Sequence, residues 1–163
     1  MNTLRLARGE AGFTLIELVV TLAIIAVLGL MTVPVAQITL QRSKEQDLRL
    51  ALREIRQALD AHKRAVDEGQ IQPPDGGSGY PSSLQALVDG VPRSADPKDG
   101  KVYFLRRVPR DPMADAPELS AEATWGLRSF DSEASDPRAG VDIYDVHSRS
   151  DRVGLNGVAY RWW

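Results

Sequence analysis

The chain has 163 residues, which is enough for one globular domain together with a membrane segment but leaves room for little more. Its formal net charge of −2 argues against a nucleic-acid-binding protein, which normally carries a concentrated basic surface. The absence of cysteine excludes disulfide bonds, thiolate zinc sites and thiol catalysis.

The first feature along the chain is an apolar segment at residues 13–36, in which Glu17 is the only charged residue. About 20 apolar residues cross the hydrocarbon core of a bilayer as a helix, so this segment is long enough to span a membrane. Arg5 and Arg8 precede it and predict a cytoplasmic N-terminus. A cleaved secretory signal is the alternative, but its apolar core is only about 7–15 residues long and ends at a small-x-small site. The nearest such site here would contain Pro34, which disfavours that alternative.

Glu17 requires an explanation, because a carboxylate within a membrane span costs roughly 2.5–3.5 kcal/mol on insertion scales. One interpretation is that it lies close enough to the cytoplasmic end to reach water, or stays protonated. The other is that the charge has a function.

Residues 12–17 read GFTLIE, after a short basic leader and at the start of the apolar helix. This pattern resembles the processing motif of type IV pilins and type II secretion pseudopilins. The resemblance implies that a prepilin peptidase cleaves between Gly12 and Phe13 and methylates the new N-terminus, so that residues 1–12 are a leader. It also makes Glu17 the fifth residue of the mature chain and places Pro34 where the family usually has a proline.

In a filament of this family, Glu17 of one subunit can neutralise the Phe13 ammonium of its neighbour. Methylation of an amine keeps its charge, so the ammonium remains a partner for the carboxylate. In a low dielectric such a pair is strongly favoured over either lone charge. We therefore expect Phe13, Glu17 and Pro34 to belong to the helix through which the subunits polymerise.

The periodicity continues beyond the apolar segment and predicts one helix from Phe13 to Glu68, amphipathic over residues 37–69. Gly69 is expected to close it. The charged residues Glu45 and Arg49 are spaced as an exposed i,i+4 pair. The apolar stripe of this half, expected to pack on the chain's own sheet or to bind a partner helix, consists of Leu48, Leu52, Ile55, Leu59 and Val66.

The remaining residues, 70–163, predict a loop, a short helix and a small sheet. The loop covers residues 70–82 and is rich in Pro, Gly and Ser. Ser82 is expected to cap the helix at residues 83–88. Strands are predicted at residues 102–108, 124–130 and 141–147. The fold class is therefore α+β, with an antiparallel sheet of about three strands packed on the amphipathic half of the long helix.

The head, residues 70–163, offers little catalytic chemistry. Asp145, His147 and Ser148 invite comparison with a catalytic triad, but adjacent strand residues point to opposite faces of a sheet. We therefore expect no enzymatic activity.

Oxygen donors cluster late in the chain, where Asp142, Asp145, Ser148 and Asp151 are candidate ligands for Ca²⁺. A solvated turn with side-chain hydrogen bonds is the alternative. The order of parts resembles the major pseudopilin of type II secretion, as do residues 79–81 (GYP), 108–112 (VPRDP) and 144–148 (YDVHS). That resemblance implies calcium in a late loop.

The leading hypothesis is a structural subunit of a type II secretion pseudopilus. Its implied partners are further copies of itself, other pseudopilins, the prepilin peptidase and an inner-membrane assembly platform. The implied location is the inner membrane, with a cytoplasmic N-terminus and a periplasmic head, and then a periplasmic filament. The alternatives are a type IV pilin or minor pilin, serving adhesion, motility or DNA uptake, and a membrane-anchored periplasmic binding or enzymatic domain.

Overall fold

The computed structural model describes residues 12–74, 77–94 and 100–163, except for the side chains of residues 30–35. The chain divides into two compact units, Met1–Leu40 and Gln41–Trp163, and helix α1 contributes residues to both. The basic leader with Arg5 and Arg8 lies outside the described residues.

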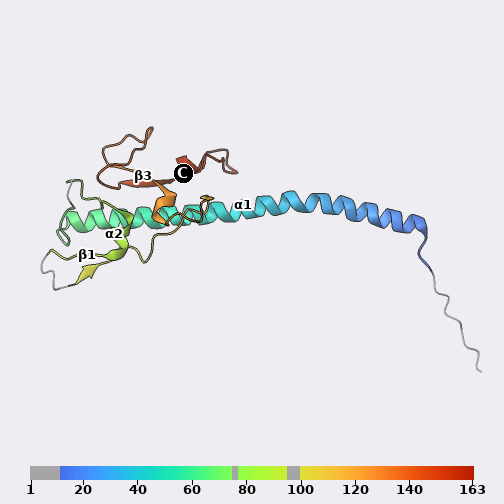
Figure 1. Cartoon of the computed structure of the whole chain (residues 1–163), viewed down its shortest axis with the longest axis horizontal. Helices are drawn as coiled ribbons and strands as arrows, with labels where there is room; N and C mark the ends of the chain where they lie inside the picture. Colours follow the sequence, from blue (N-terminus) through green and yellow to red (C-terminus); the bar gives the residue numbers. More distant parts are fainter. Residues whose placement is uncertain (1–11, 75–76, 95–99) are drawn as a thin grey trace, which may run out of the picture. The chain divides into compact units, whose positions relative to one another are not determined.

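Helix α1 extends over Leu15–Asp67, which confirms the predicted long helix to within two residues at each end (Figure 1). Its start is capped by Thr14, whose Oγ1 accepts a hydrogen bond from the Glu17 amide at 3.3 Å. Its end is closed at Gly69, which has a φ of 71° and donates to the Val66 carbonyl at 2.9 Å.

The described part of the first unit has no buried core. Every side chain described between Gly12 and Leu40 is exposed, although most of them are apolar. Within the residues that the structure describes, no helix is both long and apolar enough to cross a membrane.

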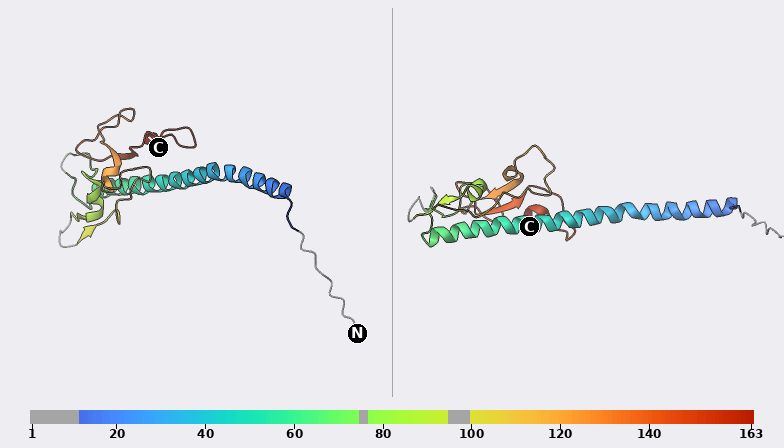
Figure 2. Two further views of the ribbon diagram at one scale, coloured as in Figure 1. Left: turned by 45° about the vertical axis from the view of Figure 1, so that its right-hand side comes forward. Right: turned by 90° about the horizontal axis from the view of Figure 1, so that it is seen from below.

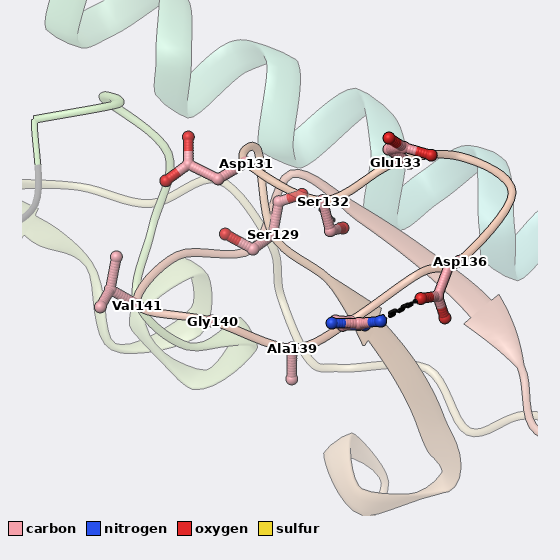
Figure 3. A pocket seen from close by; sticks show the side chains of 9 residues that line it. Ser129, Asp131, Ser132, Glu133, Asp136, Ala139, Gly140 and Val141 are labelled. Atoms are coloured by element: carbon pink, nitrogen blue, oxygen red, sulfur yellow. Dashed lines mark hydrogen bonds and ion pairs between the residues drawn. The ribbon is translucent and has the colours of Figure 1, made fainter.

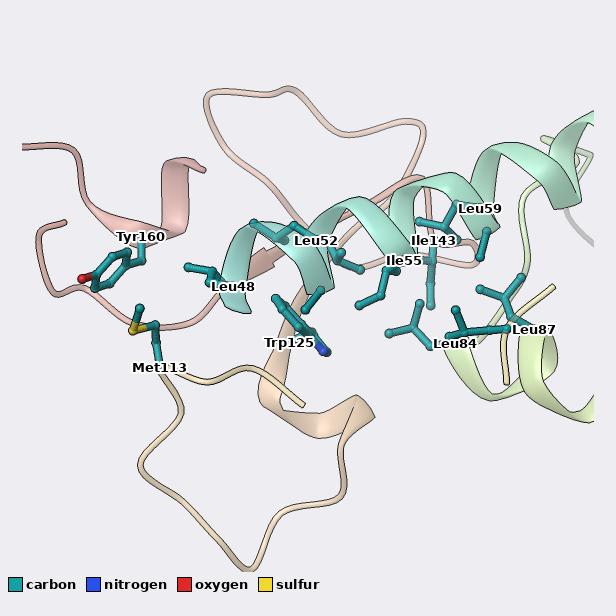
Figure 4. Close-up of a cluster of buried hydrophobic side chains, with 14 residues drawn as sticks. Leu48, Leu52, Ile55, Leu59, Leu84, Leu87, Met113, Trp125, Ile143 and Tyr160 are labelled. Atoms are coloured by element: carbon teal, nitrogen blue, oxygen red, sulfur yellow. The ribbon is translucent and has the colours of Figure 1, made fainter. Parts of the chain in front are cut away.

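The second unit contains the hydrophobic core (Figure 4). The predicted stripe of α1 supplies one side of it, with Leu48, Leu52, Ile55 and Leu59 at most 3 % exposed. Val66 is only half-buried, and the stripe also includes His62, which is 2 % exposed. The opposite side of this core is formed by Leu84, Leu87, Leu105, Met113, Trp125, Ile143, Val146 and Tyr160.

Helix α2, Leu84–Asp89, is confirmed, but its N-cap is Ser83 rather than Ser82. The Ser83 hydroxyl accepts from the Ala86 amide at 3.2 Å, which satisfies one of the free amides of the first turn. Gly90 ends the helix with a φ of 77°, and a Cβ there would lie 2.7 Å from the ring of Tyr103. Glycine is therefore required at this position.

The predicted strand at residues 102–108 is wrong for most of its length. Only β2, Lys101–Val102, is extended, and it pairs antiparallel with β1, Val91–Pro92. The next residues bind a helix end instead, because the amides of Phe104 and Leu105 both donate to the Leu87 carbonyl, at 3.1 and 3.0 Å. The α2 terminus thus takes the hydrogen bonds that a longer strand would need.

Strands β3, Trp125–Arg128, and β4, Asp145–Ser148, form a second antiparallel pair, with Gly126 opposite His147. The α+β class is confirmed, although the four short strands form two separate two-stranded sheets rather than one of three. Figures 1 and 2 show β3 and β4 alongside the second half of α1. The third predicted strand begins only at Asp145, because the Ile143 amide donates to the Pro81 carbonyl at 2.8 Å.

Candidate assembly site

The predicted cleavage bond joins Gly12 to Phe13, just ahead of α1. Both residues are exposed and non-helical, and the Phe13 side chain is 76 % exposed. A peptide bond in such a segment is accessible to a peptidase, whereas a helix would have to unwind before a bond within it could be cleaved.

Glu17 lies in the first turn of α1, where a negative charge interacts favourably with the positive end of the helix dipole. Its amide is bonded to the Thr14 hydroxyl, which fixes the start of the helix three residues ahead of it. Its side chain is exposed, and the ion pairs found among the described residues do not include it. The carboxylate is therefore free to bind a partner from outside the chain.

Apolar side chains surround α1 after this carboxylate. A helix that is apolar on all sides is normally buried in a large core or in a membrane. On both sides of Glu17, within residues 13–28, the large apolar side chains that are about half exposed or more are Phe13, Leu15, Ile16, Leu18, Val19, Val20, Leu22, Ile24, Ile25, Val27 and Leu28. Pro34, the other residue predicted to act in assembly, lies within α1, but its side chain is outside the described residues.

Asp142, the first candidate calcium ligand, is engaged by the protein itself. Its Oδ1 accepts from the Ser129 hydroxyl at 2.5 Å and from the Phe130 amide at 3.0 Å. Burial raises the pKa of this carboxyl, but hydrogen bonds, led by those from Ser129 and Ser78, bring the pKa below its usual value. Asp142 thereby connects the two ends of the loop that follows β3.

The other three candidates face different partners. Asp145 accepts from Arg56 Nε at 2.8 Å, and the exposed Asp151 accepts from Arg161 at 2.9 Å. Ser148 points into the core and donates to Asp111 Oδ2 at 2.6 Å.

Strand alternation explains part of this separation, since Asp145 and Ser148 occupy positions of β4 that point to opposite faces. Across the ranges that the structure describes, no three His, Asp or Glu side chains group as metal ligands would. The four candidates therefore have separate hydrogen-bond partners in the described structure, and the calcium site stays a prediction.

Glu45 was predicted to pair with Arg49 on an exposed face, and this prediction is wrong. The residue is 6 % exposed, and its Oε1 accepts from the Leu155 amide at 2.8 Å and the Tyr160 hydroxyl at 2.9 Å. Gln41 adds a third donor at 3.2 Å. Glu45 thereby holds the C-terminal loop, residues 149–159, on α1. The sequence did contain a signal for this burial. Glu45 precedes Leu48 by three residues, and side chains at this spacing lie on the same face of a helix.

A second polar feature is the loop at residues 130–140, which follows β3. With neighbouring residues it borders a cavity of about 600 Å³ (Figure 3). Asp136 forms an ion pair with Arg138 within the loop at 2.5 Å, whereas Asp131 and Glu133 are exposed and belong to no ion pair of the described residues.

Comparison with known proteins confirms the resemblance found at residues 12–17. Residues 7–33 match the family described as the prokaryotic N-terminal methylation motif. The type II secretion system core protein G of Pseudomonas aeruginosa is 28 % identical over 143 residues, covering 85 % of this chain and 93 % of that protein. Its counterparts from Aeromonas hydrophila and Klebsiella michiganensis are 25 % and 24 % identical, each over 83 % of this chain and 90 % of the relative. No solved structure matches significantly.

Proposed function

We propose that this chain, which carries the N-terminal methylation motif of type IV pilin-like proteins, is a structural subunit of a type II secretion pseudopilus. The observation that carries the proposal is the continuity of that motif with α1. Cleavage after Gly12 leaves an ammonium at Phe13, four residues ahead of Glu17, which belongs to no ion pair of the described residues and lies on an apolar helix.

Assembly follows from the charges at this end of the helix. The new ammonium lies beside the positive end of the helix dipole, which repels it. A nearby negative charge therefore stabilises the ammonium. In the membrane, a subunit waiting alone carries Glu17 without a counter-charge, at a cost of roughly 2.5–3.5 kcal/mol. When Glu17 contacts the Phe13 ammonium of a neighbour, both charges are compensated in a low dielectric. Pairing therefore favours the filament over the separate subunits and sets the stagger between them.

The exposed apolar surface of α1 supports a location in the inner membrane before assembly. Lipid covers such side chains in the separate subunit, and the helices of neighbouring subunits cover them in a filament. Arg5 and Arg8 support a cytoplasmic N-terminus and therefore a periplasmic head. The prepilin peptidase and an inner-membrane assembly platform are the partners that this pathway requires.

A deletion strain tests the function. Loss of this chain should abolish export of type II substrates and leave twitching motility intact, and the wild-type chain should restore export. As a control, the strain should be complemented with a variant carrying a bulky residue in place of Gly12, which should accumulate uncleaved and fail to restore export. Normal export in the deletion strain, or loss of twitching alone, would contradict the proposal and favour a type IV pilin.

A further inference from the structure

A groove in the second unit carries more positive than negative charge. It lies in the Gln41–Trp163 unit between one face of α1 and the C-terminal residues, and has a volume of about 590 Å³. Arg49, Arg53 and Arg56 line it together with one acidic side chain, Asp60. Arg56 is already paired with Asp145, whereas Arg49 and Arg53 belong to no ion pair of the described residues. The groove therefore has two guanidinium groups available for an acidic partner.

Aromatic side chains give the groove an apolar wall. Trp162 is 50 % exposed, and the Trp163 ring lies 4.5 Å below the Arg49 guanidinium. The wall is held in place, because Arg56 Nη2 donates to the main-chain oxygen of Trp163 at 2.9 Å. A site fixed in advance loses little conformational freedom on binding. Arginine and tryptophan are also the residues enriched where partners bind.

The loop at residues 130–140 has the complementary properties. Asp131 and Glu133 are exposed and belong to no ion pair of the described residues, and Glu133 accepts a hydrogen bond from the Ser135 hydroxyl at 3.2 Å. Figure 3 shows both carboxylates on the upper side of the loop in that view. Phe130, at its base, is 55 % exposed. The loop is also held in advance, because Asp142 binds the Ser129 hydroxyl and the Phe130 amide. No hydrogen bond described for the chain joins this loop to the groove.

From this complementarity we infer that the groove of one subunit binds the 130–140 loop of a second copy of the same chain. Arg49, Arg53 and the aromatic wall would meet Asp131, Glu133 and the exposed Phe130, and none of the four charged side chains belongs to an ion pair of the described residues. The two surfaces are different parts of one molecule, so the contact is heterologous and repeats from copy to copy rather than closing as a symmetric dimer does. It therefore suits a filament. This inference rests on the proposed function, to which it adds a contact between heads.

Cysteine cross-linking in whole cells tests the contact, because the 163 residues contain no cysteine. Gln57→Cys places a thiol in the groove and Ala134→Cys places one on the loop, both at exposed positions. With mild oxidant, the double variant should give a ladder of multimers beyond the dimer. Each single variant should give no ladder, and the two single variants expressed together should stop at the dimer.

Charge reversal then identifies the contact. In the double-cysteine chain, Arg53→Glu should lower the ladder yield about tenfold, because like charges placed opposite one another are strongly disfavoured. Adding Glu133→Arg should restore it. Arg64→Glu, an equal charge change on an exposed part of α1 outside the groove, should have no effect.

Three outcomes would overturn the inference: no ladder, a ladder insensitive to Arg53→Glu, or a cross-link to a protein of another size. N-terminal processing and export are measured in the same strains. If both remain normal while the ladder is absent, the head contact is wrong and the proposed function stands. If the wild-type chain is neither processed nor needed for export, the proposed function itself fails.

Discussion

Replacing Glu45 tests how the C-terminal loop is held on α1. In Glu45→Ala the Tyr160 hydroxyl, the Leu155 amide and the Gln41 amide lose their shared acceptor. A buried donor left without a partner costs about 1–3 kcal/mol. Tyr160 is 2 % exposed and carries this cost in full, whereas Gln41 and Leu155 are closer to water and recover part of theirs. We therefore expect a loss of about 3 kcal/mol in the free energy of unfolding.

The conservative variant Glu45→Gln separates the charge from the hydrogen bonds. It keeps an oxygen in the same place, but neutral hydrogen bonds are about half as strong as those to a carboxylate. We expect it to lose about 1 kcal/mol. Glu54→Ala removes an exposed carboxylate from the same helix and should change the free energy by no more than about 0.5 kcal/mol.

Urea unfolding of residues 41–163, followed by tryptophan fluorescence, measures all three variants. This unit contains every side chain that the structure describes as buried. The expected order of loss is Glu45→Ala, then Glu45→Gln, then Glu54→Ala. If Glu45→Ala were as stable as Glu54→Ala, the carboxylate would not be holding the loop, and the reasoning would be refuted.

Four further predictions follow from single features. Glu17→Ala should leave membrane insertion and cleavage intact but abolish cross-linking between N-terminal helices, and wild-type cross-linking would contradict the charge pairing. Gly126→Ala should destabilise the head by about 1–3 kcal/mol, because its Cβ would lie 2.2 Å from the His147 ring; unchanged urea unfolding would show that the ring moves freely. Burial lowers the pKa of His62 and of His147, so the unfolded chain binds more protons below pH 6.5; the melting temperature should fall from pH 7 to pH 5, and His62→Phe should reduce that fall. Because the four candidate ligands bond to separate partners, calcium should not raise the melting temperature of the head relative to chelator, and a clear rise would confirm the calcium site predicted from the sequence.

The long helix could be predicted from the sequence because its signals are local. The apolar run that begins at Phe13 and the glycine at Gly69 mark its two ends, and the spacing of Leu48, Leu52, Ile55 and Leu59 marks its buried face. The processing motif is equally local, since it depends on the identity and order of residues 12–17.

The errors have a different origin, because each depends on a partner distant in sequence. Glu45 is buried by Leu155 and Tyr160, which lie more than 100 residues away. The conformation of the segment after Val102 is set by its hydrogen bonds to the Leu87 carbonyl rather than by its own strand propensity. Distant partners also surround the candidate calcium ligands, since Asp142, Asp145 and Ser148 bond to Ser129, Arg56 and Asp111, which the sequence alone does not place beside them. Composition contains no information about such pairings.

The mass of the chain extracted from membranes tests the central claim most directly. The account predicts a single mature species that begins at Phe13 and carries a methyl group on its α-amine, because cleavage and methylation prepare the ammonium that Glu17 binds. A chain that retains Met1, or one that begins near Gln37 after removal of the whole apolar segment, would contradict it.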